Sequence, residues 1–173
     1  NEASEESAFI IVIPNRPPSF ETTANYEANE NETLDLSVSY SDPDSDDVHT
    51  VEIDWGDGSE IEPASVDPNS LRVTGSHIYA DNGQYTIYLT ITDRFGEVAN
   101  TNVDVSVKNL NPVIPETSNE TRVDKDVPVE ISQFFEDAGL ADSHTAQIDW
   151  GDNSTPSEAI VDQGLNVVTG SHN

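Results

Sequence analysis

Apolar and polar residues alternate with a period of two along much of the chain, and this pattern predicts β-strands with one buried face. The clearest runs are residues 33–40, 51–55, 85–91 and 98–107. No stretch shows helical periodicity, and turn signals separate the short strands, so we expect an antiparallel β-sandwich. The positions expected to face the core are Leu34, Leu36, Val38, Tyr40, Val51, Ile53, Trp55, Tyr85, Ile87, Leu89 and Ile91.

Turn and linker residues separate these strands. The Asp57-Gly58 pair predicts a tight hairpin, because such pairs supply positions with positive φ. Residues 93–96 (Asp-Arg-Phe-Gly) are a second expected turn. Prolines give residues 14–18 and 109–112 the character of stiff linkers, since proline fixes φ and ends strand pairing.

The chain repeats itself at a shift of 95 residues, from Ile53 to Ile148. The stretch 53–59 returns at 148–154 with a single change, Asn153 in place of a glycine. Such a repeat indicates tandem domains. Cysteine is absent, so each domain must fold on its core alone, and about 95 residues suffice for that.

The repeat divides the chain into three expected parts. Residues 1–16 form a tail with a strand at 8–13, which comes from a preceding repeat or is added to a sheet edge. Residues 17–109 form a complete domain. Residues 110–173 form a second, partial copy without counterparts of the strands at 85–107, so we expect its sandwich to lack its last two strands.

A sandwich without those strands would leave sheet edges unpaired, and unpaired edges favour self-association. The strand at 8–13 could complement another copy in this way, as in donor-strand assembly. The plainer account of the short second copy is a boundary imposed by cutting the chain. Neighbouring repeats of the same protein are the other expected partners.

The net charge of the chain limits the classes of molecule that it could bind. With 34 acidic and 6 basic residues the formal net charge is −28, which excludes phosphate-rich partners such as nucleic acid and anionic membranes. The charge either forms a solvated surface or is partly neutralised by bound cations. We expect neither a membrane span nor a signal peptide in this segment, since its apolar runs are too short.

Four motifs occur in order along the first repeat. They are Asp-Trp-Gly-Asp-Gly at 54–58, His-Ile-Tyr at 77–79, Gly-Gln-Tyr-Thr-Ile at 83–87 and Thr-Asp-Arg-Phe-Gly at 92–96. Together they resemble the W-G-D-G, H-x-Y, G-x-Y-x-V and T-D-x-x-G positions of PKD (polycystic kidney disease) domains. The resemblance covers residues 17–108 fully and 112–173 in part. It implies tandem Ig-like antiparallel β-sandwiches, the second incomplete, in an extracellular protein.

Carboxylates crowd the loop after the strand at 33–40, where Asp42, Asp44, Asp46 and Asp47 fall within six residues. Hard oxygen donors of this kind suit Ca²⁺. The spacing is not that of an EF-hand, because Asp47 stands where that loop needs glycine. The alternative is a solvated acidic loop that binds no ion.

In an Ig-like sandwich this loop shares a pole with the domain's N-terminus and with the turn at Asp93. The residues we therefore expect to converge on one calcium ion are Asn15, Asp42, Asp44, Asp47 and Asp93. Some PKD domains of secreted bacterial enzymes bind calcium at a comparable place. In the second repeat Asp137 and Asp142 align with Asp42 and Asp47, which predicts a second calcium site there.

The repeated Asp54 and Asp57 could be read as a catalytic carboxylate pair. They lie at a strand end and in the following turn, where aspartate bonds its own backbone, so we interpret them as structural. No nucleophile elbow and no phosphate-binding glycine loop is present, and we expect no enzyme activity.

The tryptophans and histidines at equivalent repeat positions are also interpreted as structural residues. Trp55 and Trp150 alternate in phase with neighbouring isoleucines, which favours core positions over carbohydrate platforms. The four histidines lack the clustered spacing of a zinc site and are expected to be partly buried strand residues.

These patterns favour a non-catalytic structural or adhesive module from an extracellular tandem-repeat surface protein, with domain junctions stiffened by calcium. The alternative is a spacer or substrate-binding accessory module of a secreted hydrolase. A catalytic domain elsewhere in the parent chain would distinguish the two.

Overall fold

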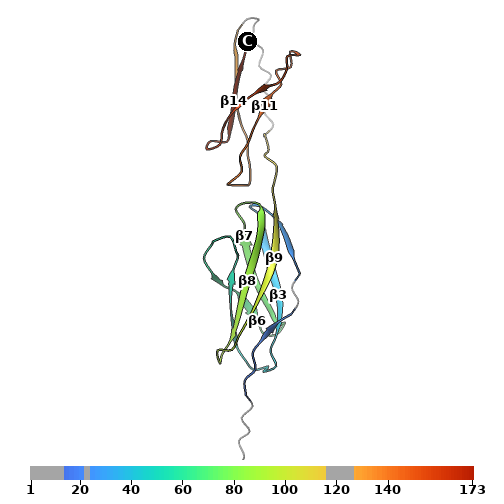
Figure 1. Cartoon of the computed structure of the whole chain (residues 1–173), viewed down its shortest axis with the longest axis vertical. Helices are drawn as coiled ribbons and strands as arrows, with labels where there is room; N and C mark the ends of the chain where they lie inside the picture. Colours follow the sequence, from blue (N-terminus) through green and yellow to red (C-terminus); the bar gives the residue numbers. More distant parts are fainter. Residues whose placement is uncertain (1–13, 22–23, 116–126) are drawn as a thin grey trace, which may run out of the picture. The chain divides into compact units, whose positions relative to one another are not determined.

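The computed structural model describes residues 14–21, 24–115 and 127–173, and every regular element in these ranges is a β-strand (Figure 1). The predicted strand at 8–13 lies outside them. The chain divides into two compact units. One comprises the described residues within 1–24, 35–75 and 86–103, and the other those within 25–34, 76–85 and 104–173. No helix in the described ranges is long and apolar enough to cross a membrane.

The strands between residues 19 and 108 form two sheets. The first has the order β1-β3-β7-β6, with β1 at Ser19–Phe20, β3 at Thr33–Ser41, β7 at Arg72–Ile78 and β6 at Ser65–Asp67. The second has the order β2-β9-β8-β4-β5, with β2 at Tyr26–Asn29, β9 at Val98–Lys108, β8 at Gly83–Asp93, β4 at His49–Asp54 and β5 at Glu62–Pro63. Figure 1 shows β8 and β9 side by side. The β2–β9 pair is parallel, whereas β4 pairs antiparallel with both β5 and β8.

The core of these sheets confirms the period-two prediction. In β3 the inward residues Leu34, Leu36, Val38 and Tyr40 are at most 5% exposed, and the residues between them face outward or lie half-buried. The predicted inward residues of β4 and β8 are likewise buried, except for the half-buried Tyr85. Alternation predicts burial here because successive side chains of a strand point to opposite faces.

The strands after residue 127 form two smaller sheets. One has the order β10-β14-β13, with β10 at Val129–Phe134, β14 at Val167–His172 and β13 at Ile160–Asp162. The other pairs β11 at Gln147–Ile148 with β12 at Ser157–Glu158. Among the described residues of this segment Phe135 and Ile148 are the buried hydrophobic side chains, whereas Leu140 is 83% exposed. The segment therefore buries less apolar surface than the sheets before it.

Trp150 departs from the expectation that both tryptophans are core residues. Trp55 is 1% exposed, whereas Trp150 is only half-buried. Trp150 stacks on His172, with ring centroids 4.9 Å apart, and its Nε1 donates a hydrogen bond to Ser157 Oγ at 2.9 Å. The difference follows from the sheets, because β4 has a neighbour on each side and β11 pairs only with β12 among the described strands.

The predicted tight hairpin at Asp57-Gly58 is also wrong. β4 ends at Asp54 and β5 begins at Glu62, so a longer loop joins them. The glycines do adopt the expected backbone, with φ of 76° at Gly56 and 86° at Gly58. Within this loop, local hydrogen bonds to the carboxylates of Asp54 and Asp57 shape two successive turns before the strand returns.

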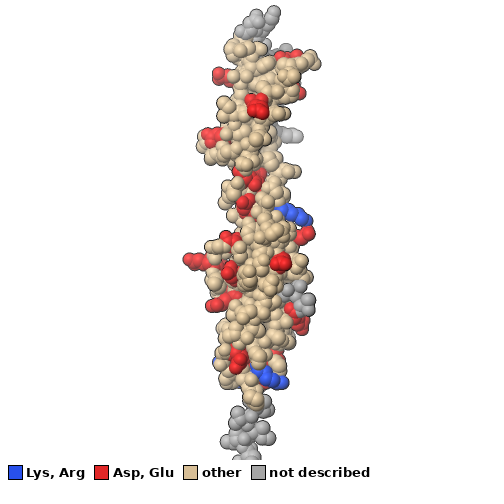
Figure 2. Space-filling model, viewed as in Figure 1, with Lys and Arg blue, Asp and Glu red and all other residues tan. Residues whose placement is uncertain are grey.

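Acidic side chains are spread over the face seen in Figure 2, and few basic ones accompany them. This distribution agrees with the net charge of −28. Two local clusters of carboxylates stand out from this general distribution.

Candidate cation-binding clusters

The first cluster lies in the loop that joins β3 to β4. Asp42, Asp44 and Asp47 each bring a carboxylate oxygen within 4.8 Å of the others. The loop is shaped locally, since Asp42 Oδ1 accepts the backbone N–H of Asp44 at 2.7 Å and the carbonyl of Asp44 accepts that of Asp47 at 3.0 Å. Asp46, also considered from the sequence, is exposed and does not belong to the group.

Asn15 and Asp93 meet each other beside this loop. Asn15 Nδ2 donates a hydrogen bond to Asp93 Oδ2 at 2.7 Å, and Asp93 pairs with His49 across β8 and β4. Asp93 is 5% exposed, and its other oxygen accepts backbone N–H groups of Phe95 and Glu97. Burial alone would raise the pKa of Asp93, but these hydrogen bonds outweigh it and lower the pKa, so the buried carboxylate stays charged.

Three of these five residues line one hollow. Asn15, Asp44 and Asp47 line it together with Arg94 and Phe95, among other residues. The polypeptide entering β1, the acidic loop and the turn after β8 therefore meet around a shared space. The five predicted residues thus appear as a triad (Asp42, Asp44, Asp47) and a hydrogen-bonded pair (Asn15, Asp93).

Two arginines and a histidine pair with the first cluster, and none of them was predicted to do so. Arg16 Nη2 lies 2.9 Å from Asp44 Oδ1, and Arg94 Nε lies 3.0 Å from Asp47 Oδ1. The side-chain and backbone hydrogen bonds from Arg16 lower the pKa of Asp44. The His49 Nε2 atom lies 2.7 Å from Asp42 Oδ2, with both side chains almost fully buried. The two arginines therefore bring positive charge to the carboxylates of the cluster, and His49 adds a buried hydrogen-bond partner.

Some buried oxygens of the first cluster nevertheless lack partners. Asn15 Oδ1 and Asp47 Oδ2 are inaccessible to solvent and accept no hydrogen bond from the protein. A buried polar atom without a partner is costly, and folded proteins seldom leave one unsatisfied. These oxygens are available to a ligand such as a metal ion.

The second cluster follows β10 and joins Asp137, Asp142 and His144. The side chain of Asp137 is 2% exposed, and neither of its oxygens accepts a hydrogen bond. His144 Nε2 lies 3.3 Å from Asp137 Oδ2. Burial raises the pKa of Asp142, and the negative charges of Glu30 and Asp137 raise it further. This second group of carboxylates is therefore short of positive charge.

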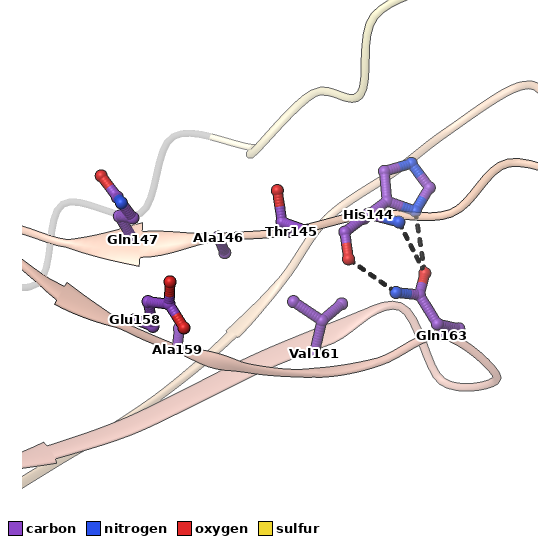
Figure 3. A pocket seen from close by; sticks show the side chains of 8 residues that line it. All are labelled: His144, Thr145, Ala146, Gln147, Glu158, Ala159, Val161 and Gln163. Atoms are coloured by element: carbon purple, nitrogen blue, oxygen red, sulfur yellow. Dashed lines mark hydrogen bonds between the residues drawn. The ribbon is translucent and has the colours of Figure 1, made fainter.

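Gln163 holds His144 in place, as Figure 3 shows. Its backbone N–H and its Nδ1 both lie 3.1 Å from Gln163 Oε1, and Gln163 Nε2 donates to the carbonyl of His144 at 2.7 Å. Gln163, Val161 and Glu158 belong to the residues that line the hollow drawn there. The sequence offered one signal for His144, since it repeats His49 and both histidines approach an aspartate.

The repeated Asp-Trp-Gly-Asp stretch has the structural role predicted for it. Asp54 Oδ1 accepts the N–H of Gly56 and Asp57 Oδ1 that of Ser59, at 2.9 and 3.0 Å. Asp149 and Asp152 make the equivalent bonds in the second copy. Each carboxylate is thus used to shape its own turn.

Comparison with known proteins gives a family and a set of similar structures. The model of the PKD domain matches residues 15–107. No curated protein matches the chain. One similar structure is the PKD domain of an M14-like peptidase from Thermoplasmatales archaeon SCGC AB-540-F20, at 24% identity over 54% of this chain and 98% of that one, with a TM-score of 0.46.

Two further structures are similar over different lengths. The PKD1 domain of Vibrio anguillarum Epp is 25% identical over 55% of this chain and 98% of that chain, with a TM-score of 0.37. A chimeric titin Z1Z2 carrying an exogenous decorin peptide is 14% identical over 91% of this chain and 82% of that chain, with a TM-score of 0.41. The matched range 15–107 covers more than half of the chain and contains all four motifs, and the chain therefore belongs to the PKD domain family.

Proposed function

We propose that this chain is a non-catalytic structural or adhesive module of an extracellular tandem-repeat protein, in which calcium stiffens the linkers between repeats. The PKD domain is a non-catalytic module, and this supports the first part of the proposal. The calcium part concerns Asn15, Asp42, Asp44, Asp47 and Asp93 in the first cluster. Asp137 and Asp142 would serve in the same way in the second cluster.

The observation that carries the proposal is the pair of unpartnered buried oxygens, Asn15 Oδ1 and Asp47 Oδ2, beside three converging carboxylates. Ca²⁺ takes six to eight oxygen ligands from carboxylates, amides and carbonyls, and the first cluster offers mainly such oxygens. Asn15 belongs to the proline-rich segment that precedes β1. An ion bound there would restrict this segment and so limit hinge motion at the linker.

Calorimetric titration of the whole chain with Ca²⁺ tests the proposal. We expect heat of binding and a melting temperature that rises with calcium and falls with a chelator, because an ion that binds only the folded state stabilises it by mass action. At a free concentration of one hundred times the Kd, that stabilisation is about 2.7 kcal/mol. A melt that ignores the chelator, together with no heat of binding, would rule the calcium role out.

Two aspartates of the same loop give a matched pair of variants. Asp44→Asn removes a carboxylate of the cluster, whereas Asp46→Asn removes the same charge from an exposed position outside it. We expect the first variant to weaken calcium binding and the second to leave it nearly unchanged. Equal losses would indicate a general effect of net charge instead of a site.

The same stiffened linker would suit the second role, a spacer or substrate-binding accessory module of a secreted hydrolase. Sequencing the parent chain distinguishes the two roles. A catalytic domain in it favours the accessory role, and further repeats without one favour the surface array.

A further inference from the structure

Glu30 is a fully buried glutamate, and only one of its two carboxylate oxygens has a hydrogen-bond partner. It lies in the turn after β2, where its N–H donates to the carbonyl of Lys108 at 3.1 Å, and it is 0% exposed. Its Oε1 accepts the backbone N–H of Leu110 at 2.7 Å. Its Oε2 has no hydrogen-bond partner. Burying a carboxylate oxygen without a hydrogen-bond partner costs free energy of folding unless a ligand binds that oxygen.

The unpartnered Oε2 atom of Glu30 lies near the second cluster. Gly139 marks the place, since a Cβ on it would lie 2.9 Å from Glu30 Oε2 and 2.7 Å from Asp142 Oδ2. The negative charge of Glu30 contributes to raising the pKa of Asp142, which also shows their proximity. Glu30, Gly139 and Asp142 all belong to the same compact unit. The unpartnered buried oxygens of Glu30 and Asp137 therefore lie close to the half-buried carboxylate of Asp142.

The basic side chains in the described ranges are occupied elsewhere. Arg16 pairs with Asp44 and Arg94 with Asp47, while Lys108 pairs with Glu27. Arg72 donates to Ser37 Oγ. None of these four reaches the second cluster. Like charges at close range in a poorly solvated place repel strongly, so the arrangement favours a counter-ion from solution.

The contacts of His144 orient its Nε2 atom toward the same place. Gln163 donates through Nε2 to the carbonyl of His144, which fixes its Oε1 as the acceptor facing Nδ1 (Figure 3). Nδ1 therefore bears the hydrogen that faces Gln163, and Nε2, which faces Asp137, is the ring nitrogen left to bind a metal ion. Metal-binding histidines commonly donate their other ring N–H to such an acceptor.

From these contacts we propose that Glu30, Asp137, Asp142 and His144 form a single divalent-cation site, in which Glu30 ties the turn after β2 to the loop after β10. The inference rests on the proposed cation binding at Asp137 and Asp142 and adds two ligands to it. Carboxylate oxygens suit Ca²⁺ and Mn²⁺ alike, whereas the imidazole nitrogen suits Mn²⁺ better. The site therefore accepts Mn²⁺ as well as Ca²⁺.

The test adds Mn²⁺ in small amounts to the whole ¹⁵N-labelled chain, because this paramagnetic ion broadens the amide signals close to it. We expect broadening at Leu110, Gly139 and Leu140, near the proposed ligands. Glu30→Gln keeps the size of the side chain and an acceptor for Leu110, and it should weaken binding at this place by about 10- to 100-fold. Glu27→Gln, on the preceding strand β2 and with the side chain 69% exposed, removes the same charge and should change little.

The possible outcomes distinguish the role of Glu30 in the second site from the proposed calcium function. Unchanged affinity at Gly139 in Glu30→Gln overturns the role of Glu30 but leaves the proposed calcium function standing. Broadening near Asp44 but not near Gly139 overturns the whole second site and leaves the first. No broadening at either place, with no heat from Ca²⁺, overturns the proposed function itself.

His144→Ala gives a separate measurement of the imidazole. We expect it to weaken Mn²⁺ binding more than Ca²⁺ binding at Gly139, because calcium has little preference for nitrogen ligands. Equal weakening of the two ions would exclude His144 from the ligand set. His77→Ala, a histidine of β7 outside both clusters, is the control for a general loss of stability.

Discussion

Gly56 lies so close to the backbone of Thr86 that a Cβ placed on it would be 2.2 Å from the carbonyl oxygen of Thr86. Gly56 lies in the loop after β4, and Thr86 lies in β8. The strands β4 and β8 are neighbours in the five-stranded sheet. The glycine of the Asp-Trp-Gly-Asp motif is therefore required twice, for its φ of 76° and for the space beside Thr86.

Gly56→Ala should be clearly more destabilising than Gly58→Ala. Both glycines have positive φ, which costs an alanine about 1–2 kcal/mol. A Cβ at Gly58 meets nothing within 4 Å, whereas at Gly56 the backbone must move, at an additional cost of about 1–3 kcal/mol. Urea unfolding of the two variants measures the difference. Equal midpoints would mean that the strand relaxes freely away from the loop.

Trp55→Ala should cost about 3–5 kcal/mol, the usual range for removing a buried tryptophan. Trp150→Ala should cost distinctly less, because Trp150 is half-buried and its main contacts are His172 and Ser157. Chemical denaturation followed by circular dichroism gives both values. A larger loss for Trp150 would contradict the burial difference between the two copies.

Asp67 should make stability depend on pH in a defined direction. Hydrogen bonds from the side chain of Ser70 and the backbone of Asn69 lower the pKa of Asp67 below that of the unfolded chain. A lowered pKa contributes stability above the unfolded value of about 3.9, and this stability is lost as the pH falls through the folded value. Asp67→Asn should therefore be less stable than the wild type at neutral pH and equal to it near pH 2, as read from urea midpoints. A difference that grows in acid would contradict this.

Arg94→Ala should tighten calcium binding at the first cluster. Arg94 Nε lies 3.0 Å from Asp47 Oδ1 and competes with an ion for that carboxylate. Arg94 is 50% exposed, and ion pairs open to solvent contribute about 0.2–1 kcal/mol, so the gain should be about fivefold or less. Arg72→Ala, which removes a guanidinium that bonds Ser37 Oγ, is the control for net charge. Weaker calcium binding in Arg94→Ala would show that the arginine supports the site.

The strands were predictable because burial and alternation are coupled over a few residues. Thr33–Ser41 and Gly83–Asp93 show the predicted inward faces, since a strand inside a sandwich has one dry side. The loop between β4 and β5 was not predictable from the Asp-Gly pair. Its length depends on where Glu62 finds its partner Ile53, and this is set by pairing across the sheet.

The second repeat also shows that local sequence does not determine how deeply a side chain is buried. Trp150 has the sequence context of Trp55 but a smaller sheet around it, so identical local residues reach different burial. Sequence alone places a side chain on a face. How deeply it is covered depends on the strands that pack beside it.

The acidic loop and the meeting of Asn15 with Asp93 beside it could be expected from sequence through the poles of a sandwich. Glu30 does not, because it stands in an unremarkable Asn-Glu-Asn turn and its neighbours Gly139 and Asp142 are more than one hundred residues away. The arginine partners of the cluster were also missed. Arg16 and Arg94 sit next to predicted ligands in the sequence, but adjacency does not say which carboxylate each would reach.

The parallel pairing of β2 with β9 bears on how this unit responds to tension. Tyr26 to Asn29 run alongside Val105 to Lys108 in the same direction, with β2 near the entry of the chain into the sheets and β9 at its exit. A force that draws the two ends apart slides these strands past each other. It loads all of their backbone hydrogen bonds together instead of opening them one at a time. The sheet is thus joined in shear at the points where a pull along the chain would act.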